Sequence, residues 1–290
     1  MNEIKISINR KVSNYKSATA HSRDRWHSLK NEIRNHRKDD KMKEIIYTEI
    51  EPQIQLNSFI KSFWHFENNS NQTLEYSILP DGCFDFLVFN KKRTQLTGLW
   101  NKRIDISIPK ETRIFAIRFK PLAVEYLFEN SISEILNSQS QNPKIKFVEN
   151  IVTDTSEFSE FAKQNSLKIA TLLGTKKGID TRKEKVFELL FNTKGTIKIS
   201  KLSEKSFWSS RQINRYFNSN FGLSAKQYAS ILKVFSTYKD LANGKLYPQT
   251  EYFDQSHFIK EIKKYTGTNP KELRNNKNDR FLQLSTNQMK

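Results

Sequence analysis

The chain has 290 residues, of which 36% are hydrophobic, and it carries a formal net charge of +18 with a mean hydropathy of −0.71. This length suggests about two domains of ordinary size. No apolar run approaches the roughly 18 residues that cross a bilayer, and the opening residues MNEIKISINRKVSNYK lack the apolar stretch of a secretory signal. A single cysteine excludes an internal disulfide and a multi-cysteine zinc site. We therefore expect a cytoplasmic protein without a membrane partner or a cofactor.

Positive charge is concentrated at the two ends of the sequence. Residues 1–41 hold 11 Lys and Arg against 5 Asp and Glu, residues 42–180 hold 17 against 17, and residues 181–290 hold 21 against 9. A strongly basic segment beside a neutral one favours a nucleic-acid-binding module attached to a different domain. A charged surface that only promotes solubility is the alternative interpretation.

The N-terminal segment 1–41 is rich in Asn, Lys, Arg, Ser and His, and its apolar residues are too sparse to predict more than a short helix. Such a composition predicts a flexible basic tail. Met42 opens the sequence MKEIIYTEIEP and is an alternative start, in which case the tail is not part of the natural protein.

Residues 42–165 predict a small antiparallel β domain with helices. The run LEYSILPDGCFDFLVFN consists of two apolar stretches around Pro80-Asp81-Gly82, which is typical of a turn. The run TRIFAIRFK alternates, so that Ile114, Ala116 and Arg118 share one face of a strand and the aromatic side chains share the other face. From Pro121 onward the apolar spacing turns helical.

Residues 181–280 predict an all-helical domain, which follows a linker over residues 166–180 and precedes a tail over residues 281–290. The apolar spacing predicts helices over residues 181–192, 199–206, 209–220 and 224–242, with Thr181 as the cap candidate of the first. The fold class expected for the whole chain is therefore α+β.

The helix predicted over residues 209–220 has one apolar and one polar face. Ile213, Tyr216 and Phe217 fall on one side at 100° per residue. Arginine matches the guanine edge and asparagine the adenine edge in the major groove, and a serine at the helix start can cap it and meet a phosphate. The predicted DNA contacts are Ser209, Ser210, Arg211, Asn214, Arg215 and Asn218. A solvated surface helix is the alternative.

A second helix, predicted over residues 254–266, repeats this pattern. Asp254 stands at the N-cap, Phe258 opens the apolar stripe, and Gly267 ends the helix. Its predicted DNA contacts are Gln255, Ser256, Lys260 and Lys263. Two such helices, joined by the long helix between them, can reach successive major grooves about 34 Å apart.

The strings SSRQINRYFNSNFGLSAKQYASILKVFS and YFDQSHFIKEIKKYTGTNPKELR resemble the double helix-turn-helix of the AraC/XylS transcriptional regulators, over about residues 185–275. The neutral half resembles a sensor-type domain often placed before this module, through SFIKSFWHFE, ILPDGCFDFLVFN and FAIRFKP. The resemblance implies a nucleoid-associated, sequence-specific regulator that binds double-stranded DNA. It leaves room for a small-molecule effector, a homodimer and contact with RNA polymerase. The groove-facing positions it implies are Arg211, Asn214, Arg215, Gln255, Ser256 and Lys260.

The stretch KLYPQTEYF, in front of the second recognition helix, departs from the family pattern. Tyr247 takes the place of a small alanine, Glu251 stands where a turn glycine is expected, and Pro248 cannot donate a backbone hydrogen bond inside a helix. This departure favours an alternative function, namely a ligand- or protein-binding regulatory module whose second helix-turn-helix no longer reads DNA sequence.

The sequence lacks the G-x-G-x-x-G, Walker A and H-E-x-x-H motifs, and we expect no enzyme activity. Asp81 and Asp85, on either side of Cys83, are candidates for a ligand pocket, although turn chemistry alone explains the segment. A catalytic centre at this turn is a third hypothesis.

Overall fold

The computed structural model describes residues 44–90, 93–128, 130–140, 151–175, 178–246, 255–276 and 280–281. The predicted tail over residues 1–41 and the C-terminal residues 282–290 lie outside the described residues. So do Tyr247, Pro248, Glu251 and Asp254, on which the predictions about the second helix-turn-helix depend.

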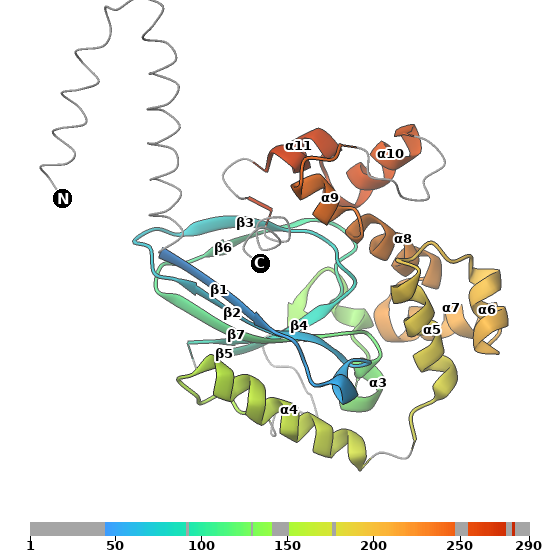
Figure 1. Cartoon of the computed structure of the whole chain (residues 1–290), viewed down its shortest axis with the longest axis horizontal. Coiled ribbons are helices and arrows are strands. Elements are labelled where there is room, and N and C mark those ends of the chain that lie inside the picture. The colour runs from blue at the N-terminus through green and yellow to red at the C-terminus, as the bar shows by residue number, and fades with distance from the viewer. Residues whose placement is uncertain are drawn as a thin grey trace, which may run out of the picture. The chain divides into compact units, whose positions relative to one another are not determined.

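The described strands form two sheets, and every pair with a defined register is antiparallel. The six-stranded sheet has the order β1 (Ile45–Ile50), β2 (Ile60–Asn68), β7 (Thr112–Phe119), β4 (Phe84–Phe89), β5 (Arg93–Thr97) and β8 (Gln139–Ser140). The two-stranded sheet pairs β3 (Leu74–Ile78) with β6 (Ile104–Ile108) and lies opposite the larger one (Figure 1). The predicted turn at Pro80 therefore joins strands of two different sheets.

The central strand β7 is buried on both faces, as its apolar alternation predicts. On one face Phe115 meets Phe161 of the helix α4 (Phe158–Gly174), with ring centroids 5.3 Å apart. On the other face Ile114 and Arg118 line a cavity between the two sheets. The two sides that the sequence assigns to this strand are confirmed.

The helix α4 covers the Phe-rich face of the larger sheet (Figure 1). It extends to Gly174, through half of the segment predicted as a linker, because Phe161 and Ile169 form one buried stripe along it. The shorter helices of this region are η1 (Ile54–Leu56), α3 (Ala123–Leu127) and η2 (Ser133–Ile135). No described helix has the length and apolarity that a membrane span requires.

The C-terminal part of the described chain is helical. Its helices are α5 (Thr181–Asn192), α6 (Ile199–Ser206), α7 (Ser210–Phe221), α8 (Ala225–Phe235), α9 (Tyr238–Ala242), α10 (Gln255–Thr266) and α11 (Pro270–Asn275). Together with the sheets they confirm the predicted α+β class. The cap of α5 is Asp180 and not the predicted Thr181, since the Asp180 carboxylate accepts from the Arg182 N–H at 3.0 Å.

The prediction of one long helix over residues 224–242 is wrong, because the helix is interrupted between α8 and α9. The hydroxyls of Ser236 and Thr237 each donate to a carbonyl three residues earlier, those of Lys233 and Val234, at 2.7 Å. Such side-chain bonds compete with the helical backbone bonds. The break lets α8 pack against α7 while α9 packs against α11.

The first helical bundle is centred on the aromatic ring of Phe187 in α5. Its centroid lies 5.4 Å from that of Phe217, 6.1 Å from Phe221 and 6.2 Å from Tyr228. Rings at these spacings stabilise a core beyond the area that they bury. This cluster joins α5, α7 and α8 into one packing unit.

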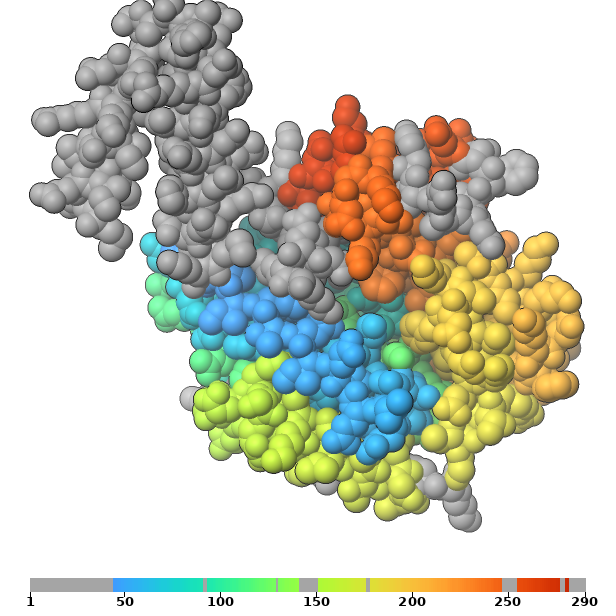
Figure 2. Space-filling model, in the orientation of Figure 1, coloured from blue at the N-terminus to red at the C-terminus, as the bar shows by residue number. Residues whose placement is uncertain are grey.

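From Ile46 onward the sheets and the helices belong to one compact unit. The hydroxyl of Tyr228 in α8 donates to the carbonyl of Gly82 in the β3–β4 turn at 2.9 Å. Ser58 donates to Glu184 in α5 at 2.7 Å, and η1 lies between α4 and α5 on the face seen in Figure 2.

The chain returns to the small sheet near its C-terminal end. The backbone N–H of Ser77 in β3 donates to the carbonyl of Arg280 at 2.7 Å, and Ser77 forms a parallel bridge with Phe281. The Arg280 Nε donates to the Ser77 hydroxyl at 3.0 Å. These residues extend the outer edge of the two-stranded sheet.

Gly195, just after α5, should be the most sensitive glycine of the helical region. Its φ is +72°, and an added Cβ would lie 2.0 Å from the Ala229 carbonyl oxygen in α8. We expect Gly195→Ala to lower the free energy of unfolding by about 2 kcal/mol or more, from left-handed backbone strain and overpacking. Gly174→Ala is the matched control, since no atom lies within 4 Å of its Cβ position. Equal denaturant midpoints for the two variants would contradict this packing.

Candidate nucleic-acid interface and ligand cavity

The helix α7 has the two faces that the sequence predicts. Ile213, Tyr216 and Phe217 are buried, whereas Arg211 and Arg215 are exposed. Ser209 is the N-cap and forms a capping box with Gln212, in which each side chain bonds the other's backbone N–H. Ser210 is half-buried, and Asn218 is exposed on the outer face.

Asn214 differs from its neighbours on α7, because its amide is used inside the bundle. Its Nδ2 donates to the Ser210 carbonyl at 3.0 Å, and its Oδ1 accepts from the Ala225 N–H at the start of α8 at 3.2 Å. Asn214 therefore ties α7 to α8, and its amide is not free for an adenine edge in this conformation.

The helix α10 presents a similar outer face. Phe258, Ile262 and Tyr265 are buried, and the predicted contacts are exposed, namely Gln255, Ser256, Lys260 and Lys263. Gly267 follows the helix with a φ of +69°, as expected for a glycine stop.

The basic side chains on these two faces are not neutralised within the described part of the chain. Arg211 and Arg215 have no acidic partner there, and α7 itself contains no acidic residue. Lys260 and Lys263 are likewise without an ion pair among the described residues. Both faces can therefore attract phosphate groups.

The turn between α6 and α7 carries a large exposed apolar side chain. Phe207 is 90% exposed and adopts a left-handed conformation with φ +52°. The following Trp208 is buried, with its ring 5.2 Å from that of Tyr216. The Trp208 side chain thus fixes the turn while Phe207 faces solvent.

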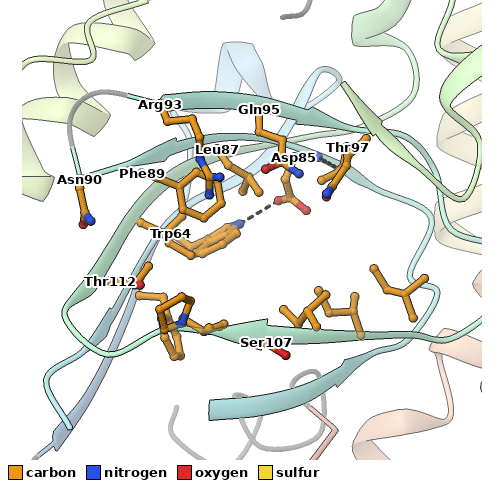
Figure 3. A pocket seen from close by; sticks show the side chains of 18 of the residues that line it. Trp64, Asp85, Leu87, Phe89, Asn90, Arg93, Gln95, Thr97, Ser107 and Thr112 are labelled. Atoms are coloured by element: carbon orange, nitrogen blue, oxygen red, sulfur yellow. Dashed lines mark hydrogen bonds between the residues drawn. The ribbon is translucent and has the colours of Figure 1, made fainter. Parts of the chain in front are cut away.

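The cavity between the two sheets has a volume of about 730 Å³. Most of its wall is apolar, with aromatic and aliphatic side chains from β2, β4, β6 and β7, and Figure 3 shows side chains from both sheets facing one open space. Arg93 lies at the mouth, with its guanidinium 4.3 Å from the centroid of Phe89. This volume lies within the range of small-molecule sites.

The polar floor of this cavity comes from four adjacent strands, β2, β7, β4 and β5. Asp85 of β4 and Arg118 of β7 are cross-strand partners, with Arg118 Nε 3.8 Å from Asp85 Oδ1. The same Asp85 oxygen accepts from the Trp64 indole N–H of β2 at 2.8 Å, and the Asp85 backbone N–H donates to the Thr97 hydroxyl at 2.8 Å (Figure 3). Asp85 is thus held in place within the cavity.

Asp81 lies behind this floor and does not line the cavity. Its Oδ1 accepts from the Cys83 N–H at 2.9 Å, which closes the turn, and its Oδ2 pairs with the Arg118 guanidinium. Burial lowers the pKa of Arg118, but Asp81 and Asp85 more than offset this effect, so its pKa lies well above the ordinary value. Arg118 therefore remains a cation shared by the two carboxylates.

Cys83 is buried, and burial raises the pKa of its thiol to about 12. The thiol is therefore protonated at neutral pH, which argues against a nucleophile at this turn.

Trp64 and Arg118 were not among the predicted site residues. The available signal was Arg118 itself, a charged side chain on the same strand face as Ile114 and Ala116 in an otherwise apolar run. Such a residue requires a buried partner. Trp64 gave no comparable signal, since its role depends on the pairing of β2 with β7.

Comparisons with known proteins give limited matches. A family model described as a domain of unknown function, DUF6597, matches residues 48–141, which include β2 to β8. No curated protein matches the chain. Two solved structures of ToxT from Vibrio cholerae are similar at 11% identity. An apo variant has a TM-score of 0.38, and the match covers 80% of this chain and 97% of that chain. The wild type with bound unsaturated fatty acid has a TM-score of 0.33, and the match covers 80% of this chain and 94% of that chain. At these scores the similarity supports no functional argument.

Asp85→Asn should stabilise the free protein at neutral pH. Burial raises the pKa of the Asp85 carboxyl above its ordinary value of 3.8, and Arg118 only partly offsets this. The contribution of Asp85 to the free energy of unfolding is favourable and complete below pH 3.8, and it is lost as the pH rises through the raised pKa. In thermal unfolding experiments, the Tm of the variant relative to that of the wild type should therefore increase from acid to neutral pH.

The other charged groups that act on Asp85, namely Arg118, Asp81 and Glu49, remain in the variant, and their net effect on the Asp85 charge is already part of its raised pKa. A variant that is less stable than the wild type at neutral pH would contradict a destabilising Asp85 charge.

Proposed function

We propose that this chain is a DNA-binding transcription regulator of AraC/XylS type, which inserts α7 and α10 into successive major grooves. One observation carries this proposal. Two amphipathic helices pack against α8, and each presents an exposed face of basic and amide side chains opposite a buried apolar face. This is the arrangement that major-groove recognition requires.

The charge distribution supports the same function. Residues 181–290, which include the proposed DNA-binding domain over residues 181–280, hold 21 Lys and Arg against 9 Asp and Glu. Arginines without an acidic partner among the described residues, such as Arg211 and Arg215, suit bidentate contacts to guanine and to phosphate. Duplex affinity should therefore fall steeply with salt, because each phosphate contact releases counterions.

We assign the β-rich region, proposed as residues 42–165, a regulatory role. Its cavity supports binding of a small-molecule effector, and its turn at Gly82 contacts α8 between the two proposed recognition helices. A homodimer and contact with RNA polymerase are compatible with this arrangement and belong to the same proposal.

Arg211→Ala should weaken sequence discrimination by about 1–3 kcal/mol, because a guanidinium in the groove reads base edges. A duplex selected from a random pool by the wild type provides the specific site. Fluorescence anisotropy then compares this duplex with unrelated DNA, for both proteins and at several salt concentrations.

Arg113→Ala is the matched control, because it removes the same charge from β7 in the β domain. It should leave discrimination unchanged. An absence of duplex binding by the wild type at low salt would refute the proposed function.

A second candidate function is a ligand- or protein-binding module that no longer reads DNA sequence through its second helix-turn-helix. The cavity favours the ligand-binding part of this candidate, and the engaged amide of Asn214 removes one base contact from the first recognition helix. The paired substitution Tyr247→Ala and Glu251→Gly restores the family pattern. If selection yields a specific duplex only for the repaired protein, the second candidate holds; if the natural chain selects the same duplex, it fails.

A further inference from the structure

The carboxylates at the cavity floor and directly behind it outnumber the cation between them. Asp81 and Asp85 face a single cation, Arg118, whose guanidinium pairs with Asp81 Oδ2 and lies 3.8 Å from Asp85 Oδ1. Only the Oδ1 oxygen of Asp85 has a hydrogen-bond donor among the described residues, the Trp64 indole. Its second oxygen therefore remains able to accept from a ligand inside the cavity, toward which the carboxylate points in Figure 3.

The walls favour an apolar ligand body. Trp64 and Phe66 from β2 and Trp100 after β5 lie opposite the isoleucines of β6. Trp64 is further supported by Tyr47, whose ring centroid lies 6.4 Å away in a stacked arrangement. Such a cavity takes a hydrophobic molecule and orients it by a few polar contacts.

An anionic head fits this floor poorly. A ligand carboxylate at Arg118 would place three acidic groups around one guanidinium, and like charges at such distances repel. The cations at the mouth, Arg93 and Lys110, are exposed, so water and salt screen them, whereas Asp85 is largely withdrawn from solvent.

We propose that the cavity binds a small molecule with an apolar body and one ammonium head, that the head pairs with Asp85, and that Arg118 transmits this binding to α8. The regulatory half of this inference rests on the proposed function, whereas the binding half does not. Burial already raises the pKa of Asp85, so a ligand cation relieves a charge that the fold leaves only partly compensated.

The path to α8 is short and consists of described contacts. An ammonium at Asp85 takes over part of that carboxylate's charge, and the Arg118 guanidinium then shifts its pairing toward Asp81. Asp81 closes the turn through the Cys83 N–H, and the same turn presents the Gly82 carbonyl to Tyr228. A shift of this turn therefore moves the hydrogen-bond partner of α8.

Tryptophan fluorescence of the full chain tests the ligand class, since Trp64 and Trp100 line the cavity. The probes are 4-phenylbutylammonium, 4-phenylbutanol and 4-phenylbutanoate, which share one apolar body. The ammonium should bind about tenfold more tightly than the alcohol, because its hydrogen bond to Asp85 is charge-assisted, and the carboxylate should bind most weakly.

Asp85→Asn should abolish the preference for the ammonium, whereas Asp240→Asn, on the helix α9 and not among the cavity-lining residues, should retain it. The comparison of the three probes on the wild type is independent of any variant's folding. Tighter binding of the carboxylate, equal binding of all three, or no binding would each overturn the proposed ligand class.

Hydrogen exchange of the α8 amides tests the transmission without DNA, so its outcome does not depend on the proposed function. Addition of 4-phenylbutylammonium should change exchange over Ala225–Phe235 in the wild type. Tyr228→Phe should bind the probe with the same affinity but lose this change, because the bond to Gly82 is absent.

Gly82→Ala is a second variant for the same contact, since its Cβ would lie 2.7 Å from Leu232 Cδ2 and 3.1 Å from the Tyr228 hydroxyl. It too should bind the probe without the α8 response. The proposed transmission would be overturned if the wild type bound the probe without any change in α8 exchange. It would also be overturned if the two variants showed the same change in α8 exchange as the wild type. Failure to bind DNA would refute the proposed function alone.

Discussion

The hydrogen bond from Tyr228 to the Gly82 carbonyl joins the two structural halves of this molecule. The Tyr228 ring belongs to the aromatic core of the first helical bundle, 5.4 Å from Phe217, while its hydroxyl reaches the turn that leads into β4. Loss of the bond would leave a buried carbonyl without a donor, at a cost of about 1–3 kcal/mol. Because α7 and α10 both pack on α8, the position of α8 against this turn governs both proposed recognition helices.

The two faces of the larger sheet have different roles, because side chains alternate between the faces along each strand. Its Phe-rich face packs on α4 and supplies stability, whereas the opposite face places Asp85 and Arg118 in the cavity. The Arg118 charge is compensated by pairing with Asp81 and Asp85, whereas burial leaves the Asp85 charge only partly compensated. Polar residues at the inward positions of β4 and β7 thus separate a binding face from a packing face.

Local patterns in the sequence were sufficient for the outer faces of α7 and α10, because amphipathic spacing and caps act within a few residues. The same patterns were insufficient where distant residues decide the outcome. The break before α9 depends on the hydroxyls of Ser236 and Thr237, which can also be accommodated within a helix. Of the cavity residues only Asp85 was predicted. Arg118 stood out as a charge in an apolar run, but its partners, like the role of Trp64, depend on strand pairings that no local pattern specifies. Asn214 looked like a groove contact from its helical position, although its amide ties two helices together.

The contact between Ser77 and Arg280 has a consequence for the order in which the protein takes shape during synthesis. These residues are 203 positions apart, and the ribosome makes β3 long before its outer neighbour. The N-terminal strands can pair as they emerge, but the outer edge of the small sheet gains this partner only after the helices between them have been translated. The small sheet, whose strand β6 forms one wall of the cavity, therefore gains this outer neighbour only after the helical region has been made.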